Sequence, residues 1–498
     1  MEKNKTTIFV ILGCILLIGI TVSFAYYLAS IEGTGKSITL KSKNLKITFT
    51  ESNNLSGENI SPGWSKTSTF TVKNEGSNSY TYNIVIKDLV NTFVTTGNLQ
   101  YKITSTDGGY NMTDFKDIPK SSVATNKKIA TNITIAGNGT HTYTILFTYK
   151  NSEDNQAEDM GKTLSGQIII DEYIIPTLAE QLLEDNPTIN TRSDFSSVFT
   201  ETNTGTLYKS TESIAGSTPK EVYYFAGNVQ NNWVKFGGYY WRIIRTNADG
   251  SVRLLFSGTR PDTNEAYIGS SKFNENYNSP KYVGYMYGNS DTTLEEARTN
   301  TNDSTIKTYI DNWYANNLTT YTNYLSNDAV YCNDRSVTNG EEYSLTSTFF
   351  YSGYYRTHYT KGLFTEVNFD CPDIKDAFSV NNTEAKLKYP IALITGEEIV
   401  AAGGKVDTNA NVWYSLNSNN ESITGEMWWS TMTPDYFNTT TSNVWRIVGS
   451  ENLGMYRGGN VYYVNSVRPV ISIAPCALYS SGDGSANAPY EIVENGGC

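Results

Sequence analysis

Alternating apolar and polar positions recur through residues 36–173. Phe70 and Val72 alternate with threonine and lysine, and Tyr143 and Ile145 share one side of a later run. Alternation with a period of two predicts strands with one buried and one solvated face. About seven such runs between turn-rich gaps predict an antiparallel β-sandwich. The runs are NLKITFT, TSTFTVK, YTYNIVI, LQYKITS, TNITIA, HTYTILFTYK and GQIIIDEY.

The pattern changes at residues 174–220. The stretch IIPTLAEQLLED predicts a short helix beginning at Pro176, where a missing backbone N–H costs nothing. A polar, turn-rich stretch follows. We therefore expect residues 174–220 to be a linker with a short helix.

Residues 221–498 mix strand and helix signals, which predicts a separate α+β domain. Two apolar runs, 241–245 and 252–256, flank Asn-Ala-Asp-Gly, and Asp-Gly suits a hairpin turn. Apolar residues at helical spacing predict a helix from Ser304. Thr395 and Glu398 form a capping-box pattern at the start of another short helix, and Gly403 marks its end.

The first thirty residues indicate where the protein acts. Residues 8–20 are continuously apolar, which is short for a membrane span but suits the core of an export signal. Cleavage near Ala25 fits the small-residue rule, whereas extending the apolar run to Leu28 would allow an uncleaved anchor. Cys14 lies too early in the run for a lipoprotein signal. We therefore expect residues 1–30 to be a signal peptide or an N-terminal membrane anchor, and the rest to be extracellular or at the cell surface.

The charge balance narrows the possible partners. The formal net charge is −12, with 18% charged residues. A strongly acidic chain repels phosphate backbones and anionic lipid heads, so we expect neither nucleic-acid nor peripheral membrane binding.

The cysteines suggest disulfides. Besides Cys14 there are four: Cys332, Cys371, Cys476 and Cys498. An even number in an exported region favours two disulfides, and we choose the nearest-neighbour pairs Cys332–Cys371 and Cys476–Cys498. Four free thiols are the alternative. The chain has no C-x-x-C and no Cys/His cluster, so we expect no zinc or other metal.

The N-terminal half resembles the TasA/camelysin family of Gram-positive bacteria over residues 8–173. The resemblance rests on SFAYYLAS, KNLKITF and ISPGWSKTSTFTVKNEGSNSYTYNIVI. It implies an aromatic-rich export signal and a jelly-roll-like sandwich at 31–173. Family members form or accompany surface fibres, which implies possible self-assembly. Some are called proteases, but this segment has no H-E-x-x-H motif, and we interpret its one histidine, His141, as a surface residue on a strand.

The C-terminal half resembles bacterial surface domains of unknown function related to the C-type lectin fold, which also includes formylglycine-generating enzymes and retroelement-diversified receptors. The resemblance covers residues 221–494 and rests on WVKFGGYYWRIIRTNADGSVRLLF, YPIALITGEEIVAAGG, WWSTMTP and NSVRPVISI. The chain has Thr-Met-Thr-Pro at 431–434 where Ser-Pro is more usual. The calcium-dependent sugar triplets of C-type lectins are absent, and we interpret Gly-Asp-Gly at 482–484 as a turn.

Two tryptophans, Trp428 and Trp429, are adjacent in the sequence. They either pack in the core or form an aromatic surface that binds a ligand. Neighbouring side chains of a strand point to opposite faces, so one tryptophan is expected to enter the core. A sugar platform built by the pair is the alternative. We expect Arg468, in the V-R-P-V stretch, to pair with buried carbonyls or an acid.

Candidate ligand residues lie in TPDYFNTTTSNVW and GSENLGMYRGGNVYY. Tyrosine and arginine make large rigid contacts while Asn, Ser and Gly adapt their hydrogen bonds, as in antibody paratopes, so we expect polar binding loops here. The ordinary alternative is surface loop without a ligand. The candidates are Tyr436, Phe437, Asn438, Trp445, Arg446, Tyr456 and Arg457.

Catalysis has little support in the sequence. The only histidines, His141 and His358, fall in different predicted domains, and no nucleophile-elbow, zinc-protease, P-loop or dinucleotide motif is present. We interpret Glu398 as a helix cap; its neighbour Glu397 would point elsewhere. The sequence thus predicts a cofactor-free, non-enzymatic surface protein, in which a sandwich spacer displays a domain that binds an unknown glycan or protein. A fibre or biofilm-matrix subunit and a formylglycine-generating type of enzyme are the alternatives.

Overall fold

The chain forms two compact units that divide between Ile174 and Ile175, next to the predicted end of the sandwich at residue 173. The fold is mainly β, as the sequence predicts, and most strand pairs are antiparallel. The computed structural model describes residues 40–42, 45–49, 54–55, 60–152, 156–193, 195, 206–261, 263–357, 368–406, 417–418, 421–422, 424, 427–448 and 455–494.

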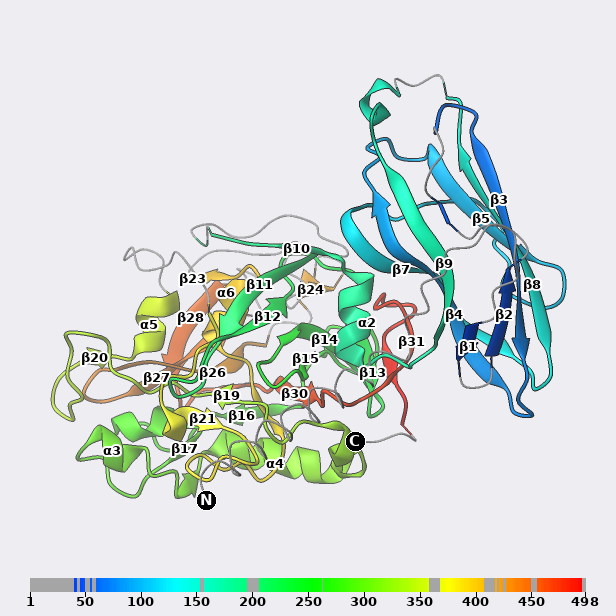
Figure 1. The fold of residues 1–498 in the computed structure, drawn as a ribbon. Coiled ribbons are helices and arrows are strands. Elements are labelled where there is room, and N and C mark those ends of the chain that lie inside the picture. Colours follow the sequence, from blue (N-terminus) through cyan, green and yellow to red (C-terminus); the bar gives the residue numbers. More distant parts are fainter. Residues whose placement is uncertain are drawn as a thin grey trace, which may run out of the picture. The chain divides into compact units, whose positions relative to one another are not determined.

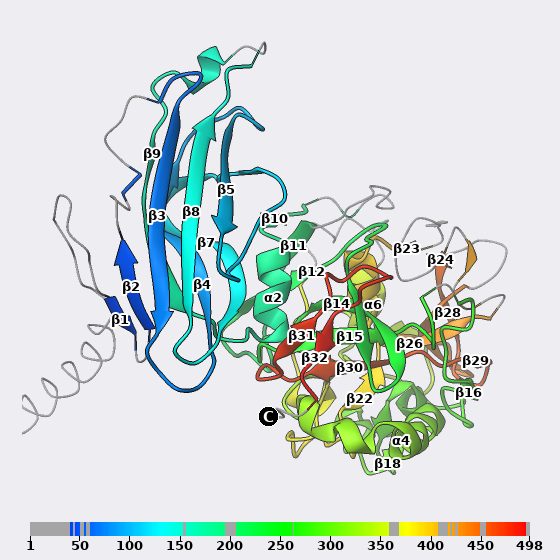
Figure 2. The ribbon, with the colours of Figure 1, turned by 90° about the vertical axis from the view of Figure 1, so that its right-hand side faces the viewer.

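The first unit is a two-layer β-sandwich (Figures 1 and 2). One sheet has the order β1-β2-β3-β8-β5-β6 and the other the order β7-β4-β9, all antiparallel. Its strands are β1 Leu40–Ser42, β2 Leu45–Phe49, β3 Ser65–Asn74, β4 Tyr80–Asn91, β5 Leu99–Ser105, β6 Lys116–Asp117, β7 Ser121–Ile135, β8 Thr140–Tyr149 and β9 Leu164–Glu172, with a 3-10 turn at Ala157–Asp159.

Period-two alternation builds the core of this sandwich. In β3, Phe70 and Val72 are buried, and the neighbouring strand β8 of the same sheet buries Tyr143 and Ile145. They pack in one cluster with Ile84 of the opposite sheet. The sequence prediction of an antiparallel sandwich is therefore confirmed for this unit.

His141 corrects one sequence prediction. It lies on β8, as expected, but only 7% of it is exposed, because the alternation that turns Tyr143 inward turns His141 inward as well. Its Nδ1 lies 2.8 Å from the Tyr82 hydroxyl, which also bonds the Tyr143 hydroxyl at 2.7 Å. Burial lowers the pKa of His141, against the opposing effect of Asp107. The surface interpretation of His141 was wrong.

The second unit is built on two larger sheets and several short helices (Figure 1). The first sheet has the order β10-β11-β12-β14-β15-β30-β22, with β13 on β14, and the second the order β16-β29-β26-β27-β28-β23, with β20 on β26. The strands of the first are β10 Thr188–Asn190, β11 Thr206–Glu212, β12 Lys220–Tyr224, β13 Trp233–Phe236, β14 Tyr239–Thr246, β15 Val252–Phe256, β22 Ile391–Leu393 and β30 Pro469–Ile473. The strands of the second are β16 Ser270–Lys272, β20 Phe349–Phe350, β23 Lys405–Val406, β26 Trp429–Phe437, β27 Ser442–Ile447, β28 Met455–Asn460 and β29 Val464–Ser466.

Short elements fill the remaining described parts of this unit. The helices are α2 Leu178–Asp185, α3 Leu294–Ala297, α4 Thr305–Asn317, α5 Ser352–Thr357 and α6 Gly396–Ala401, with 3-10 turns at Pro280–Val283, Thr319–Tyr324 and Ile374–Asp376. Small paired strands are β17 Met286–Tyr287 with β18 Asn302–Asp303, β19 Tyr331–Cys332 with β21 Ala377–Phe378, β24 Asn417–Ser418 with β25 Glu421–Ser422, and β31 Tyr479–Ser481 with β32 Glu491–Ile492.

Local signals placed several of these elements correctly. β14 and β15 form the predicted hairpin, and Gly250 has a φ of 85°, which a glycine adopts without strain. Ser304 caps α4 through the Lys307 amide. Thr395 and Glu398 form the predicted capping box at α6.

The predicted linker at 174–220 is only partly correct. The short helix exists as α2, capped by Thr177 rather than begun at Pro176. β10 and β11, however, belong to the first large sheet of the second unit, because β11 pairs with β12 over Tyr208–Glu212. The sequence did not predict these strands because their composition is polar and rich in turn residues. Pairing with other strands stabilises them in spite of this weak local propensity. The second unit thus begins near residue 175 and not at 221.

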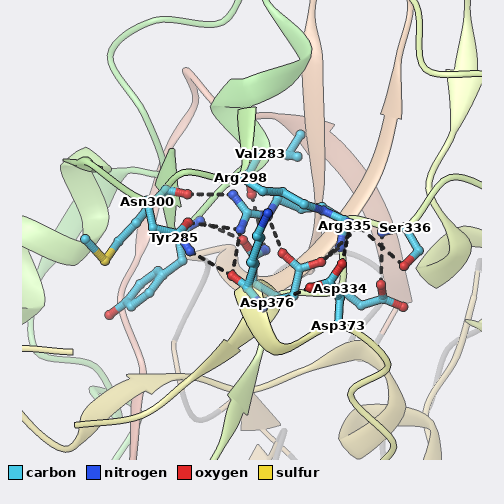
Figure 3. A network of polar contacts seen from close by, with 12 residues as sticks. Val283, Tyr285, Arg298, Asn300, Asp334, Arg335, Ser336, Asp373 and Asp376 are labelled. Carbon is cyan, nitrogen blue, oxygen red and sulfur yellow. Dashed lines mark hydrogen bonds and ion pairs between the residues drawn. The ribbon is translucent and has the colours of Figure 1, made fainter. Parts of the chain in front are cut away.

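A buried polar network fixes the irregular segments below these sheets (Figure 3). Arg335 donates from Nε to Asp376 at 2.6 Å and from Nη2 to Asn300 at 3.0 Å. Arg298 binds Asp373 at 2.7 Å and Asp376 at 3.1 Å. Burial raises the pKa of Asp376 in spite of both arginines. Breaking such a buried pair costs about 3–5 kcal/mol, so these loops are held rigidly.

Candidate functional site

Most of the candidate ligand residues lie in strands and not in loops, which corrects the sequence prediction. Much of the two segments that we expected to be binding loops forms the antiparallel ribbon β26–β27–β28. Tyr436 and Phe437 end β26, Trp445 and Arg446 lie in β27, Tyr456 and Arg457 lie in β28, and only Asn438 is in a turn.

Two of these candidates belong to the core. Phe437 is 1% exposed and Trp445 is 2% exposed. Tyr354 of α5 stacks on Trp445, with ring centroids 6.2 Å apart, so a helix covers that face of the ribbon. When both faces of a strand are covered, its buried positions include polar as well as aromatic residues. Such a mixed sequence is easily mistaken for a loop. Phe437 and Trp445 are therefore structural, and their assignment to a binding loop was wrong.

The tryptophan pair separates as the alternation rule predicts. Trp429 is 1% exposed and packs in the core, with the Arg468 guanidinium 4.6 Å from its ring centroid. Arg468 is itself buried and donates to the Phe256 carbonyl, as expected from the sequence. Trp428 remains half-buried at the start of β26. One tryptophan thus anchors the sheet and the other faces outward.

Arg446 connects Trp428 to a second aromatic residue. Its guanidinium lies 4.0 Å from the ring centroid of Trp428 and 5.0 Å from that of Tyr463, which is 50% exposed. Gly459 leaves room for this arrangement, because a Cβ there would lie 2.2 Å from Arg446 Nε. The contacts between the cation and the rings are favourable and restrict the rotamers of all three side chains.

A second aromatic pair includes Tyr462, which directly precedes Tyr463 at the turn between β28 and β29. The rings of Tyr462 and Tyr277 meet edge to face at 5.4 Å, and Lys272 Nζ lies 3.6 Å from the Tyr462 ring centroid. Both tyrosines are more than 40% exposed. β16, β28 and β29 lie together at one end of the second unit (Figure 2).

We call this group the aromatic–cationic surface. Its members are Lys272, Tyr277, Trp428, Arg446, Tyr462 and Tyr463. Of these residues, Arg446 was a candidate from the sequence and Trp428 was considered, whereas Tyr462 and Tyr463 lay within a candidate segment without being nominated themselves. The available signal was the adjacent pair Tyr462-Tyr463 after Asn460, since two large neighbours cannot both be buried in a strand with one wet face.

Asp435 of β26 is a buried carboxyl group with an incomplete set of hydrogen bonds. Asp435 is 2% exposed, and within the described residues its Oδ1 has no hydrogen-bond partner. Its other oxygen occupies the space that a Cβ on Gly458 would fill, at 1.8 Å. Burial raises the pKa of Asp435 well above its ordinary range. Asp435 lines none of the hollows described below, and we do not assign it a ligand.

Glu398 has a role that the capping motif did not reveal. Besides capping α6, it accepts from Arg245 at 2.8 Å and from Arg253 at 2.5 Å, while Arg245 also pairs with Glu212 at 2.9 Å. Burial disfavours the charged Glu398 carboxylate, but Arg253 and Arg245 outweigh burial and lower its pKa. The cluster joins α6 to β11, β14 and β15, which stiffens the unit that carries the aromatic–cationic surface.

The cysteines follow the predicted pairing where the structure describes them. Cys332 and Cys371 form a disulfide. Cys476 is also disulfide-bonded; its predicted partner Cys498 lies outside the described residues. So do His358 and the segment 1–30 that we expect to direct export. Within the described ranges, no helix is both long and apolar enough to cross a bilayer.

Comparisons with known proteins add little. No family model matches the chain, and no curated protein does. Among solved structures, the chain is similar to a family 123 glycoside hydrolase from Clostridium perfringens, at 12% identity and a TM-score of 0.12. The match spans 26% of this chain and only 25% of that one. A similarity this weak supports no conclusion about fold or activity.

Proposed function

We propose that this is an exported, non-enzymatic surface protein whose second unit binds an external glycan or protein ligand through the aromatic–cationic surface. The observation that carries the proposal is the exposure of Tyr462 and Tyr463, with Tyr463 and the half-buried Trp428 packed against Arg446. Tyrosine, tryptophan and arginine are the residues that dominate binding energy at interfaces. Soluble domains seldom group such side chains on the outside without a partner.

The rigid frame beneath supports this interpretation. Trp429, Arg468 and the Glu398 cluster fix the strands from within, so little conformational entropy remains to be lost when a ligand binds. The sandwich then serves as the spacer between the cell surface and the binding unit. The resemblances to the TasA/camelysin family and to C-type-lectin-like surface domains agree with this arrangement and remain predictions.

A formylglycine-generating enzyme is less well supported. Such chemistry would require reactive thiols, and Cys332 and Cys371 are joined to each other. A fibre subunit would require the sandwich to polymerise, and no described contact bears on that alternative.

The proposal is tested with the full chain, first by fractionating cells that express it and then by screening the purified protein against a glycan panel and whole cells. The double variant Tyr462→Ala/Tyr463→Ala should lose binding and keep its melting temperature. The matched control is Ile189→Ala/Leu345→Ala, which removes apolar side chains that are 40% and 41% exposed elsewhere in the same unit. Equal binding by both double variants, or retention of the protein in the cytoplasm, would contradict the proposal.

A further inference from the structure

An acidic cleft lies on the second unit, lined by residues other than those of the aromatic–cationic surface. Two hollows of about 300 Å³ and 460 Å³ adjoin, because Ile214, Asp328 and Val330 line both. Their combined size is that of a ligand site. One wall contains Ser217, Thr218 and Lys220, and the other contains Ile374, Ala377, Ser379, Asn381, Asn382, Thr383 and Glu384.

The disulfide holds the two walls in place. Ile214 forms a β-bridge with Cys371, and Cys371 is bonded to Cys332. Cys332 in turn pairs with Ala377 on the opposite wall. The width of the cleft is therefore fixed by covalent and backbone links rather than by loop packing.

The lining is acidic. Its carboxylates are Glu212, Asp249, Asp328 and Glu384, against the single cation Lys220 among the lining residues described. Arg245 already neutralises Glu212, so three carboxylates face one lysine. Asp328 and Glu384 are exposed. The carboxylates of the lining lie apart from one another. In the described chain, no group of three or more acidic, His or Cys side chains lies close enough to hold a metal ion.

The lining also contains one buried amide side chain. Asn247 lines the cleft and is 4% exposed. Its Nδ2 donates to Ser251 Oγ at 2.8 Å, and the hydroxyl proton of Ser251 goes to Asp249, so the amide orientation is determined. Asn247 Oδ1 is left without a hydrogen-bond partner among the described residues. That oxygen is closed to solvent, so a ligand in the cleft would reach it only if the Asn247 side chain moved.

We propose that this cleft binds a positively charged peptide segment through lysine side chains. Separated carboxylates suit several ammonium groups along an extended chain better than one compact ion. Ile214, Val330 and Ile374, which is 41% exposed, supply apolar surface for the methylene stems of the lysines. The site is independent of the aromatic–cationic surface, so either proposal can fail alone.

The test is calorimetric titration of the full chain with a tetralysine peptide and, in parallel, a tetraglutamate peptide. Tetralysine should bind and tetraglutamate should not. Asp328→Asn and Glu384→Gln should each weaken tetralysine binding about three- to tenfold, because each removes one charged contact. Ile214→Arg, which places a cation on the wall, should abolish it.

The control is Glu158→Gln, an exposed charge change on the first unit that alters the net charge equally. Equal weakening by Glu158→Gln would show attraction to the acidic chain as a whole and overturn the proposal. Absence of tetralysine binding, or full binding by Ile214→Arg, would overturn it as well. Spermidine binding as tightly as tetralysine would overturn the assignment to a peptide.

Discussion

Glu398 offers a sharp test of how the second unit is held rigid. Glu398→Gln keeps the shape of the side chain and the acceptor for the Thr395 amide, which lies 3.0 Å from Oε2. It removes the charge that Arg245 and Arg253 share, and leaves Glu212 alone to balance two buried guanidinium groups. Breaking a buried ion pair in this way costs about 3–5 kcal/mol.

That cost converts into a measurable shift. At about 2 °C per kcal/mol for a unit of this size, the transition of the second unit should fall by about 6–10 °C in calorimetry of the full chain. The matched control is Glu295→Gln, whose side chain is 65% exposed and pairs with Lys375 at 2.6 Å. A surface pair contributes about 1 kcal/mol or less, so the control should shift by about 2 °C or less. Equal shifts in the two variants would refute the reasoning.

The pH dependence gives the same prediction a second check. The folded pKa of Glu398 lies below its ordinary value of 4.5. Its stabilisation is therefore complete above that value and is lost as the pH falls through the folded pKa. The stability difference between the wild type and Glu398→Gln should be largest at neutral pH and shrink in acid. A difference that grows in acid would show that Glu398 is not a buried charged partner.

Three further outcomes follow from the described contacts. Asp435→Asn should be more stable than the wild type at pH 8 and nearly equal at pH 4, measured by urea unfolding, since a raised folded pKa means that stability is lost as the pH rises. Replacing Cys332 and Cys371 with serine should cost about 4 kcal/mol, estimated from loop closure across the 39-residue separation and measured by urea unfolding against the oxidised wild type; an unchanged stability would show that this disulfide does not constrain the unfolded chain. Gly459→Ala should displace Arg446 and weaken ligand binding while changing the melting temperature little, because the clash is with a flexible side chain; unchanged binding would argue against a role for Arg446.

Much of the fold was readable from local patterns. Alternation placed β3 and β8, Asp-Gly placed the hairpin of β14 and β15, and the capping box placed α6. These signals work because each depends on residues close in sequence. They also predicted that one of the two adjacent tryptophans is buried, and the structure shows that it is Trp429.

What failed depends on distant partners. β11 was hidden in a polar stretch because its pairing with β12 stabilises it. Trp445 looked like a loop residue because the helix that covers it is far away in the chain. The contacts of Glu398 with Arg253 and Arg245 span 145 and 153 residues. Tyr462 and Tyr463 lay within a predicted binding segment, but apart from their adjacency nothing local to the sequence distinguished them from its other polar and aromatic residues.

The central claim is that a stiff ribbon, with its own aromatic residues buried, presents other aromatic residues to an external ligand. The most direct measurement compares cell or glycan binding and melting temperature for Tyr463→Ala and Trp445→Ala in the full chain. The account predicts that Tyr463→Ala loses binding at an unchanged melting temperature, whereas Trp445→Ala destabilises the second unit by about 3–5 kcal/mol. Undiminished binding by Tyr463→Ala, or a melting temperature unaffected by Trp445→Ala, would contradict it.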